Sequence, residues 1–245
     1  MSALDEQIRT AVRYFWLKRG EQAHKQATGK KRDAGDRAAV TGGKQMDGFV
    51  DLICTSLNTA GVPDACLYRN RAVQLPGWFR AEKQWDLIVK VENELVAVLE
   101  LKSQVGPSFG NNFNNRSEEA LGSASDLVAA FREGAFKPSP RPWVGYLMLL
   151  EDCEASQRPV GVEEPHFKVF PEFRDASYAK RYEILLQKLV RDQLYDAAAF
   201  LLSPKEAVTD GSFTMPNPEL SLENLMTTLI GRAVAAKVRR TALRE

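Results

Sequence analysis

Two short apolar runs in the first half of the chain constrain its fold more than any other feature. Residues 85–91 read WDLIVKV, residues 95–101 read LVAVLEL, and Glu-Asn-Glu separates them. Short runs rich in Val, Ile and Leu are typical of strands, and so brief a connection joins antiparallel neighbours. We therefore predict a β-hairpin with a three-residue loop over residues 92–94.

The register of this hairpin decides which polar side chains meet. With a three-residue loop, Val91 pairs with Leu95. The same register places Asp86 directly opposite Glu100, with Cβ atoms roughly 5 Å apart on one face. Lys102 is two residues beyond Glu100 and points to that face too. The other face is expected to be apolar core throughout: Leu87, Val89, Val91, Leu95, Ala97, Leu99 and Leu101.

These polar residues form a candidate catalytic group. Two carboxylates this close repel each other unless a cation lies between them. Mg²⁺ prefers oxygen ligands, so Asp86, Glu100 and the carbonyl of Leu101 are candidate ligands. A bound metal stabilises charge on a phosphodiester and acidifies a water, which Lys102 would orient while it holds a phosphate oxygen. The pattern predicts metal-dependent phosphodiester hydrolysis. The plainer alternative is a surface ion pair between Glu100 and Lys102.

Patterns elsewhere in the chain predict helices on both sides of the hairpin. Apolar residues at helical spacing favour helices over 4–26, 44–60, about 117–135, 177–202 and 221–240. Further strands are expected over 65–75 and 143–150, and polar loops over 27–43 and 103–116. This order predicts an α/β (α+β) fold with a mixed central sheet flanked by helices and extra C-terminal helices. We expect a single domain over residues 1–245, with a catalytic core at about 44–150 and a helical part at about 175–245.

Charge and composition narrow the functional classes. The net charge is +1, but nine basic and three acidic residues lie between Arg13 and Lys44. Basic segments on a neutral body suit a phosphate-binding surface, although a solvated tail has the same composition. The three cysteines include no C-x-x-C pair, which argues against a zinc ribbon. No run of eighteen apolar residues occurs, so we expect a cytoplasmic protein that does not span a membrane.

The polar segment after the second apolar run is the leading candidate for DNA contact. It reads SFGNNFNNR over residues 108–116, and it follows Lys102 closely in the chain. Asn can pair with adenine and Arg with guanine through two hydrogen bonds each. A turn-rich surface loop is the alternative, since Asn and Gly favour turns. The candidate DNA-binding residues are Asn111, Asn112, Asn114, Asn115 and Arg116.

With these residues in place, the chain resembles the PD-(D/E)XK nuclease superfamily. Asp86 and Glu100-Leu101-Lys102 stand on consecutive predicted strands, although Trp85 replaces the proline of that motif. Stretches such as GWFRAEKQWDLIV and ELKSQVGPSFGNNFNNR also resemble the XhoI family of type II restriction endonucleases over essentially the full length. The resemblance implies a PD-(D/E)XK core and a homodimer that needs Mg²⁺. It further implies that the dimer cuts double-stranded DNA at the palindrome CTCGAG and leaves five-prime overhangs.

Some questions stay open at this point. Many members of the superfamily carry a further acid on the preceding helix, for which Asp47 and Asp51 are candidates; both also suit a solvated helix face. A repair nuclease or junction resolvase would use the same core on another substrate. A DNA-binding protein without catalytic activity would keep the three polar residues as structure alone.

Overall fold

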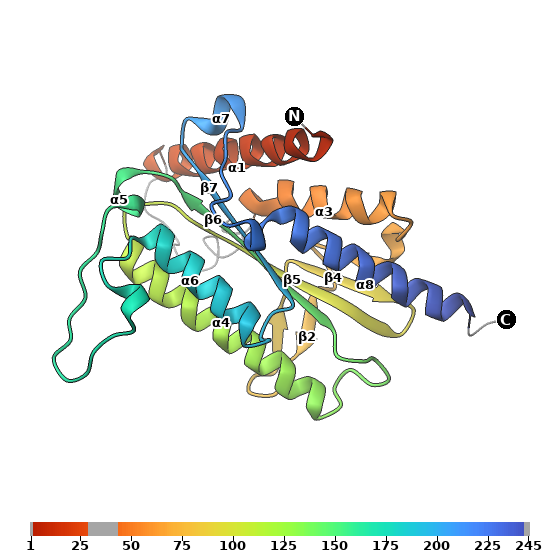
Figure 1. Ribbon diagram of the computed structural model, residues 1–245. Coiled ribbons are helices and arrows are strands. Elements are labelled where there is room, and N and C mark those ends of the chain that lie inside the picture. The colour runs from red at the N-terminus through yellow and green to blue at the C-terminus, as the bar shows by residue number, and fades with distance from the viewer. Residues whose placement is uncertain (1, 29–43, 243–245) are drawn as a thin grey trace.

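A five-stranded mixed sheet forms the centre of the molecule (Figure 1). The computed structural model describes residues 2–28 and 44–242. The strands follow the order β1 (Leu67–Tyr68), β4 (Leu87–Val91), β5 (Glu94–Gln104), β6 (Trp143–Glu151) and β7 (Ala197–Ser203). The pairs β1–β4 and β4–β5 are antiparallel, whereas the pairs β5–β6 and β6–β7 are parallel. The prediction of a mixed sheet flanked by helices is confirmed.

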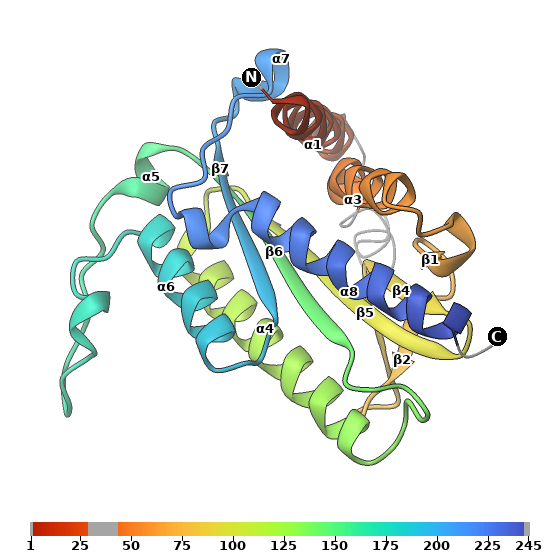
Figure 2. The ribbon, with the colours of Figure 1, turned by 45° about the vertical axis from the view of Figure 1, so that its right-hand side comes forward.

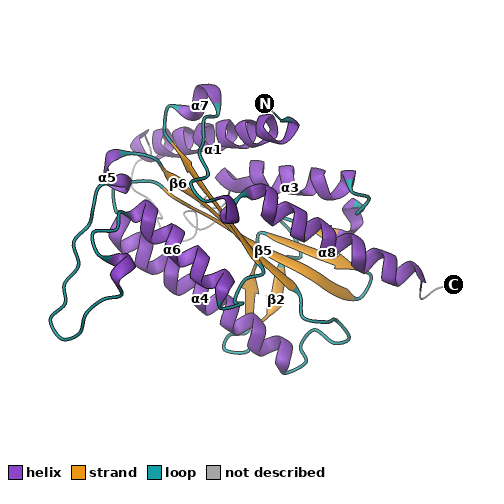
Figure 3. Cartoon of the chain, viewed as in Figure 1, coloured by secondary structure: helices purple, strands orange, loops and turns teal. Residues whose placement is uncertain are grey.

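Helices cover both faces of this sheet (Figures 2 and 3). On one face lie α1 (Ala3–Thr28), α3 (Asp47–Thr59) and α8 (Leu222–Ala242), and on the other α4 (Phe109–Arg132) and α6 (Tyr178–Arg191). A separate two-stranded ribbon pairs β2 (Gln74–Pro76) with β3 (Glu82–Gln84). Short connecting helices complete the chain: η1 (Lys44–Met46), η2 (Asp64–Cys66), α5 (Glu154–Gln157), η3 (Pro171–Phe173), α7 (Ala207–Asp210) and η4 (Pro218–Leu220).

The hairpin has the predicted register at its open end and a different one at its turn. Leu87 pairs with Leu99 and Val89 with Ala97, as expected. A bulge then shifts the register, and Val91 pairs with Glu94 instead of Leu95. The predicted three-residue loop is therefore wrong. The turn has two residues, and Glu92 adopts a φ of 53°, as the tight hairpin turns that match strand twist require.

The bulge also corrects the expected distribution of side chains over the two faces. Leu95 lies with the α4 and α6 core, while Val96 and Ala97 both lie with the α1, α3 and α8 core. The face that carries Glu100 is itself buried, since Ile88 and Val98 pack there beneath α4. The catalytic candidates thus stand at the edge of a second core and not on an open surface.

Three predicted elements differ from the structure. The strand expected over 65–75 is interrupted, because Asn70 and Ala72 have φ values of 63° and 54° that no extended strand allows. The loop expected over 103–116 is wrong, since β5 continues to Gln104 and α4 begins at Phe109. Phe109 and Phe113 are one helical turn apart and contact Tyr178 and Tyr182 of α6, which stabilises this early helix start.

The helix expected over 177–202 is wrong in its second half. Helix α6 ends at Arg191, Gln193 has a φ of 58°, and β7 begins at Ala197. The run AAAFLL favours a helix by propensity, but here it pairs with β6 and is buried between the two helical layers. The part expected to be helical at about 175–245 therefore contributes an edge strand to the central sheet.

The remaining element predictions are confirmed. Helices α1, α3 and α8 match the runs at 4–26, 44–60 and 221–240, and β6 matches the strand at 143–150. Residues 29–43, most of the expected loop at 27–43, lie outside the described residues. Within residues 2–28 and 44–242, none of the helices combines the length and apolar character that crossing a bilayer requires.

Candidate active site

Asp86 immediately precedes β4 and continues its pairing with β5. Its backbone N–H donates to the Leu99 carbonyl at 3.1 Å. Its side-chain Oδ2 accepts a hydrogen bond of 2.7 Å from the Leu101 N–H. The Asp86 carboxylate thus accepts a hydrogen bond that a backbone carbonyl would accept if β4 were longer. This bond holds the carboxylate beside the segment of β5 that carries Glu100 and Lys102.

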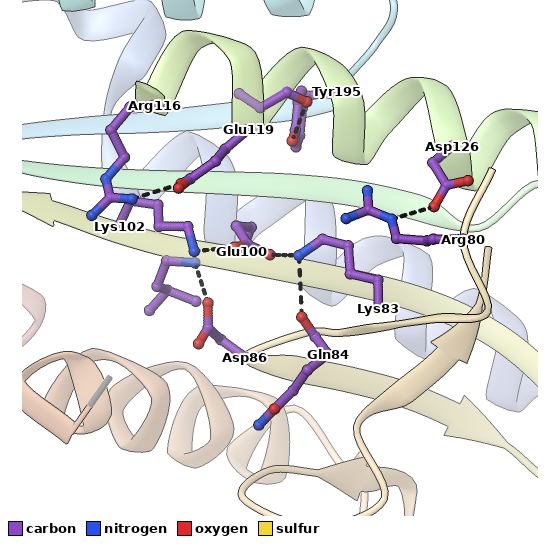
Figure 4. A network of polar contacts seen from close by, with 12 residues as sticks. Arg80, Lys83, Gln84, Asp86, Glu100, Lys102, Arg116, Glu119, Asp126 and Tyr195 are labelled. Carbon is purple, nitrogen blue, oxygen red and sulfur yellow. Dashed lines mark hydrogen bonds and ion pairs between the residues drawn. The ribbon is translucent and has the colours of Figure 1, made fainter. Parts of the chain in front are cut away.

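Glu100 lies at the centre of a charged cluster between β3 and β5 (Figure 4). Only 5% of its side chain is exposed. Oε2 accepts from Lys83 Nζ at 2.6 Å, and Oε1 forms an ion pair with Lys102 Nζ. A buried carboxylate with two ammonium partners is well compensated, so this is a formed site and not a surface ion pair.

Lys83 belongs to this charged cluster, and the sequence reasoning missed it. It stands on β3, and its Nζ lies 4.5 Å from the ring centroid of Trp85, which is buried. The three-residue strand β3 (EKQ) is too short for its alternation to indicate a strand, and the pairing with β2 that orients Lys83 is not local. The residue that replaces the motif's proline, Trp85, therefore provides an aromatic face for this lysine.

Burial and neighbouring charge perturb the ionisation of the cluster. The pKa of Asp86 is raised to about 6, first by burial and then by the charge of Glu100, against the opposing effects of the Leu101 N–H and of the two lysines. Burial lowers the pKa of Lys102, but the charge and hydrogen bond of Glu100 outweigh it and the pKa is raised overall. A bound cation would stabilise the charged form of Asp86.

The donor set is compatible with Mg²⁺. Within the described part of the chain, no group of three or more His, Cys, Asp or Glu side chains is arranged to hold a metal. Mg²⁺ is commonly bound through one or two carboxylates together with waters and substrate oxygens, so the pair Asp86 and Glu100 meets its needs. Zn²⁺ sites, by contrast, use several Cys or His ligands.

The candidates for a further acid, Asp47 and Asp51, lie in the first two turns of α3. Asp51 forms an ion pair of 3.0 Å with Arg69. Burial and the nearby charge of Asp51 raise the pKa of Asp47, which Lys44 partly opposes. The two acids thus influence each other's charge at the start of α3, and a part of Asp47 in the reaction stays a prediction.

The predicted DNA-binding residues form the first turns of α4. Asn111, Asn114 and Asn115 are exposed, whereas Asn112 and Arg116 are half-buried. Arg116 Nη1 lies 2.6 Å from Glu119 Oε2. The charge of Glu119 in turn raises the pKa of Lys102, which places this part of α4 beside the cluster (Figure 4). Arg116 and Glu119 of α4 thus lie near Lys102, and contact between the asparagines and DNA stays a prediction.

Comparison with known proteins agrees with this site. The restriction endonuclease XhoI family matches residues 25–215. The type II restriction enzyme BstVI of Geobacillus stearothermophilus is 50% identical over 84% of this chain and 94% of its own length. The type II restriction enzyme XhoI of Xanthomonas vasicola is 42% identical over 88% of each chain. The type II restriction enzyme AbrI of Azospirillum brasilense is 48% identical over 67% of this chain and 74% of its own length.

No solved structure matches the chain. The family match and the extent of the similarity confirm the resemblance found in the sequence. The names of the three relatives give no support to a repair nuclease, a junction resolvase or a DNA-binding protein without activity. The chain belongs to the restriction endonuclease XhoI family, and by that membership it is an enzyme of the type II restriction endonuclease class.

Proposed function

We propose that this chain hydrolyses phosphodiester bonds of duplex DNA with Mg²⁺ as its cofactor, and that Asp86, Glu100 and Lys102 carry the reaction. The observation that supports this most is the clustering of Asp86, Glu100 and two lysines at the paired ends of adjacent strands. A cation-binding carboxylate pair beside an ammonium group suits a substrate that is a polyanion. The enzyme class of the relatives supports duplex DNA as that substrate.

Each residue has a distinct part in the proposed reaction. The carboxylates of Asp86 and Glu100 would hold the metal. In an antiparallel pair the N–H and C=O of one residue face the same neighbour, so the Leu101 carbonyl faces the side on which Asp86 accepts the Leu101 N–H. It is therefore the natural third ligand. When bound, Mg²⁺ would supply charge stabilisation at the phosphate and a more acidic water.

Lys102 would act directly on the substrate. Its side chain is 26% exposed, more than the 12% of Lys83, and its ammonium lies at the Glu100 carboxylate. An ammonium in this position can hold a non-bridging phosphate oxygen and the attacking water in line with each other. Its raised pKa keeps it charged at neutral pH.

The target and the assembly are proposed on the family resemblance. We propose CTCGAG as the site, cut in each strand to leave five-prime overhangs. A two-fold symmetric site is most simply read by a two-fold symmetric protein, so the active form would be a homodimer. Bases or phosphates would be contacted by the exposed turn of α4: Asn111, Asn112, Asn114, Asn115 and Arg116.

One experiment tests the substrate, the cofactor and the target together. Plasmid DNA is incubated with the purified protein in Mg²⁺ or in EDTA, and the ends of the fragments are sequenced. We expect cleavage only with Mg²⁺, at one palindrome, with five-prime overhangs. Cleavage in EDTA would contradict the metal proposal, and ends at another sequence would contradict CTCGAG. Fragment ends that lie at DNA junctions, whatever their sequence, would instead indicate a resolvase.

A further inference from the structure

The connection between β2 and β3 displays two large aromatic side chains to solvent. Trp78 is 55% exposed and Phe79 is 76% exposed. All four tryptophans of the chain are described, and the other three are buried at 2–6% exposure. Apolar side chains of this size normally pack in a core, so a neighbouring exposed pair marks a contact surface.

This aromatic tip, residues Trp78 and Phe79, is held in place by one carboxylate. Asp126 of α4, whose side chain is 5% exposed, accepts the backbone N–H groups of both aromatic residues at 2.8 Å through Oδ1. Its Oδ2 accepts from Arg80 Nε at 2.7 Å (Figure 4). The loop passes so close that a Cβ on Gly77 would meet both Asp126 Oδ2 and the Arg80 carbonyl. The tip is therefore preorganised and is not a loose loop.

The same ribbon joins the aromatic tip to the active site. The strand β3 begins three residues after Phe79 and carries Lys83, which contacts Glu100. Lys83 lies four residues after Phe79 in the chain, so even a fully extended connection between them would span at most about 14 Å. Stacked base pairs rise about 3.4 Å each, so this span corresponds to at most about four base pairs. A duplex whose scissile phosphate lies at Lys102 is thus within reach of the tip.

We propose that the aromatic tip is an apolar wedge that enters the DNA duplex a few base pairs from the cleaved bond and unstacks a base step there. The inference rests on the proposed DNA substrate and adds a second contact to it. Proteins that bend DNA insert apolar side chains between base steps, and stacking on an aromatic ring compensates for the lost base stacking. Side chains that are inserted between base pairs must be held in a fixed orientation, and the three hydrogen bonds to Asp126 hold this loop rigidly.

Continuity with the active site favours DNA over a second protein copy as the partner. The tip and the cluster share one ribbon, which lies beside β4, β5 and α4 in both views (Figures 1 and 2). If the tip instead contacts a second copy of the chain, its removal should change the oligomeric state and leave base unstacking unaffected.

The test compares Trp78→Ala/Phe79→Ala with Phe167→Ala, which removes an 89% exposed aromatic from another surface loop. Trp78→Phe serves as a conservative variant. The probe is a short duplex centred on the site that the wild-type protein cuts, with 2-aminopurine placed at each step in turn. Binding is measured in Ca²⁺ without Mg²⁺, so that fluorescence of the unstacked base and affinity are read apart from cleavage. Sedimentation gives the oligomeric state of each variant.

We expect the wild type to increase 2-aminopurine fluorescence at one step on each side of the site. The double variant should lose this signal and bind roughly 10- to 100-fold more weakly, while Phe167→Ala matches the wild type and Trp78→Phe keeps most of the signal. A double variant that keeps the signal overturns the wedge, as does one that changes only the oligomeric state. A wild-type protein that neither binds nor cuts any duplex overturns the proposed function, and the wedge with it.

Discussion

Lys83 Nζ lies 2.6 Å from Glu100 Oε2, so the carboxylate that pairs with Lys102 also pairs with a lysine from a different sheet. This contact joins the β2–β3 ribbon to the central sheet at the proposed active site. Replacing Lys83 with Ala leaves Glu100 with Lys102 as its remaining lysine partner. We expect the free energy of unfolding to fall by about 1–3 kcal/mol, the usual contribution of a hydrogen bond to a charged group.

The same variant separates a positioning role from a catalytic one. Cleavage by Lys83→Ala should fall less than cleavage by Lys102→Ala, and Lys83→Arg should restore much of it. Urea unfolding and plasmid cleavage are the measurements, and Lys168→Ala, whose side chain is 78% exposed, is the matched control. Equal stability of Lys83→Ala and wild type would show that the contact holds nothing in place.

The catalytic assignment predicts a large and selective loss of activity. Asp86→Ala and Glu100→Ala each remove a proposed metal ligand, and Lys102→Ala removes the charge beside the phosphate. Cleavage should fall by several orders of magnitude in all three, because hydrolysis relies on that charge stabilisation. Lys90→Ala is the control, since Lys90 lies beyond the bulge near the hairpin turn. A folded Glu100→Ala protein that cuts plasmid at the wild-type rate would refute the assignment.

The stability of the metal-free protein should depend on the ionisation of Asp86. Its pKa of about 6 in the folded state exceeds the ordinary 3.8, because burial and Glu100 outweigh the Leu101 N–H, Lys102 and Lys83. The folded state therefore binds the proton more tightly than the unfolded chain. The free energy of unfolding should fall as pH rises from about 4 to about 6, and this contribution is constant above that range.

The variant Asp86→Asn isolates this effect, since the amide oxygen can still accept the Leu101 N–H. In EDTA it should be more stable than wild type at pH 7, by up to about 3 kcal/mol. The difference should vanish below about pH 4. Urea unfolding at several pH values measures it, and a difference that is independent of pH would contradict the assignment of the titration to Asp86.

The exposed turn of α4 makes a prediction about specificity. Asn114→Ala removes an exposed amide, and Arg116→Ala removes a guanidinium that Glu119 holds at 2.6 Å. If they read bases, binding to the cognate duplex should weaken by about 1–3 kcal/mol more than binding to a random duplex. Equal losses on both duplexes, with a shallower salt dependence, would identify phosphate contacts. Anisotropy titrations in Ca²⁺ at several salt concentrations distinguish the two, with Glu118→Ala as the control on the same helix.

Asp126 should prove to be a positioning residue for the aromatic tip. Asp126→Ala removes the acceptor of two backbone N–H groups and of Arg80. Limited proteolysis should then cut the 77–81 loop faster, while the spectrum of the folded protein is retained. Asp126→Asn keeps an oxygen for the two N–H groups and should be cut at an intermediate rate. An unchanged rate in Asp126→Ala would show that other contacts fix the loop.

The sequence by itself determined the hairpin and the alignment of Asp86 with Glu100 and Lys102. Those features depend on period-two patterns over a few residues, which are local properties of the chain, whereas the length of the turn was predicted wrongly. The amphipathic helices α1, α3 and α8 followed from equally local spacing. The bulge between Val89 and Lys90 preserves this alignment, because its extra residue offsets the turn that is one residue shorter than predicted.

Where packing opposed local propensity, only the tertiary structure decided whether a segment forms a helix, a strand or a loop. The AAAFLL run is a strand because β6 offers it a parallel partner between two helical layers, and the Asn-rich segment is helical because Phe109 and Phe113 contact α6. Lys83 reaches Glu100 through a ribbon in which β3, a stretch that the local sequence does not mark as a strand, pairs with β2. Such contacts join residues far apart in the chain, and their burial energy exceeds the small propensity differences that a sequence pattern records.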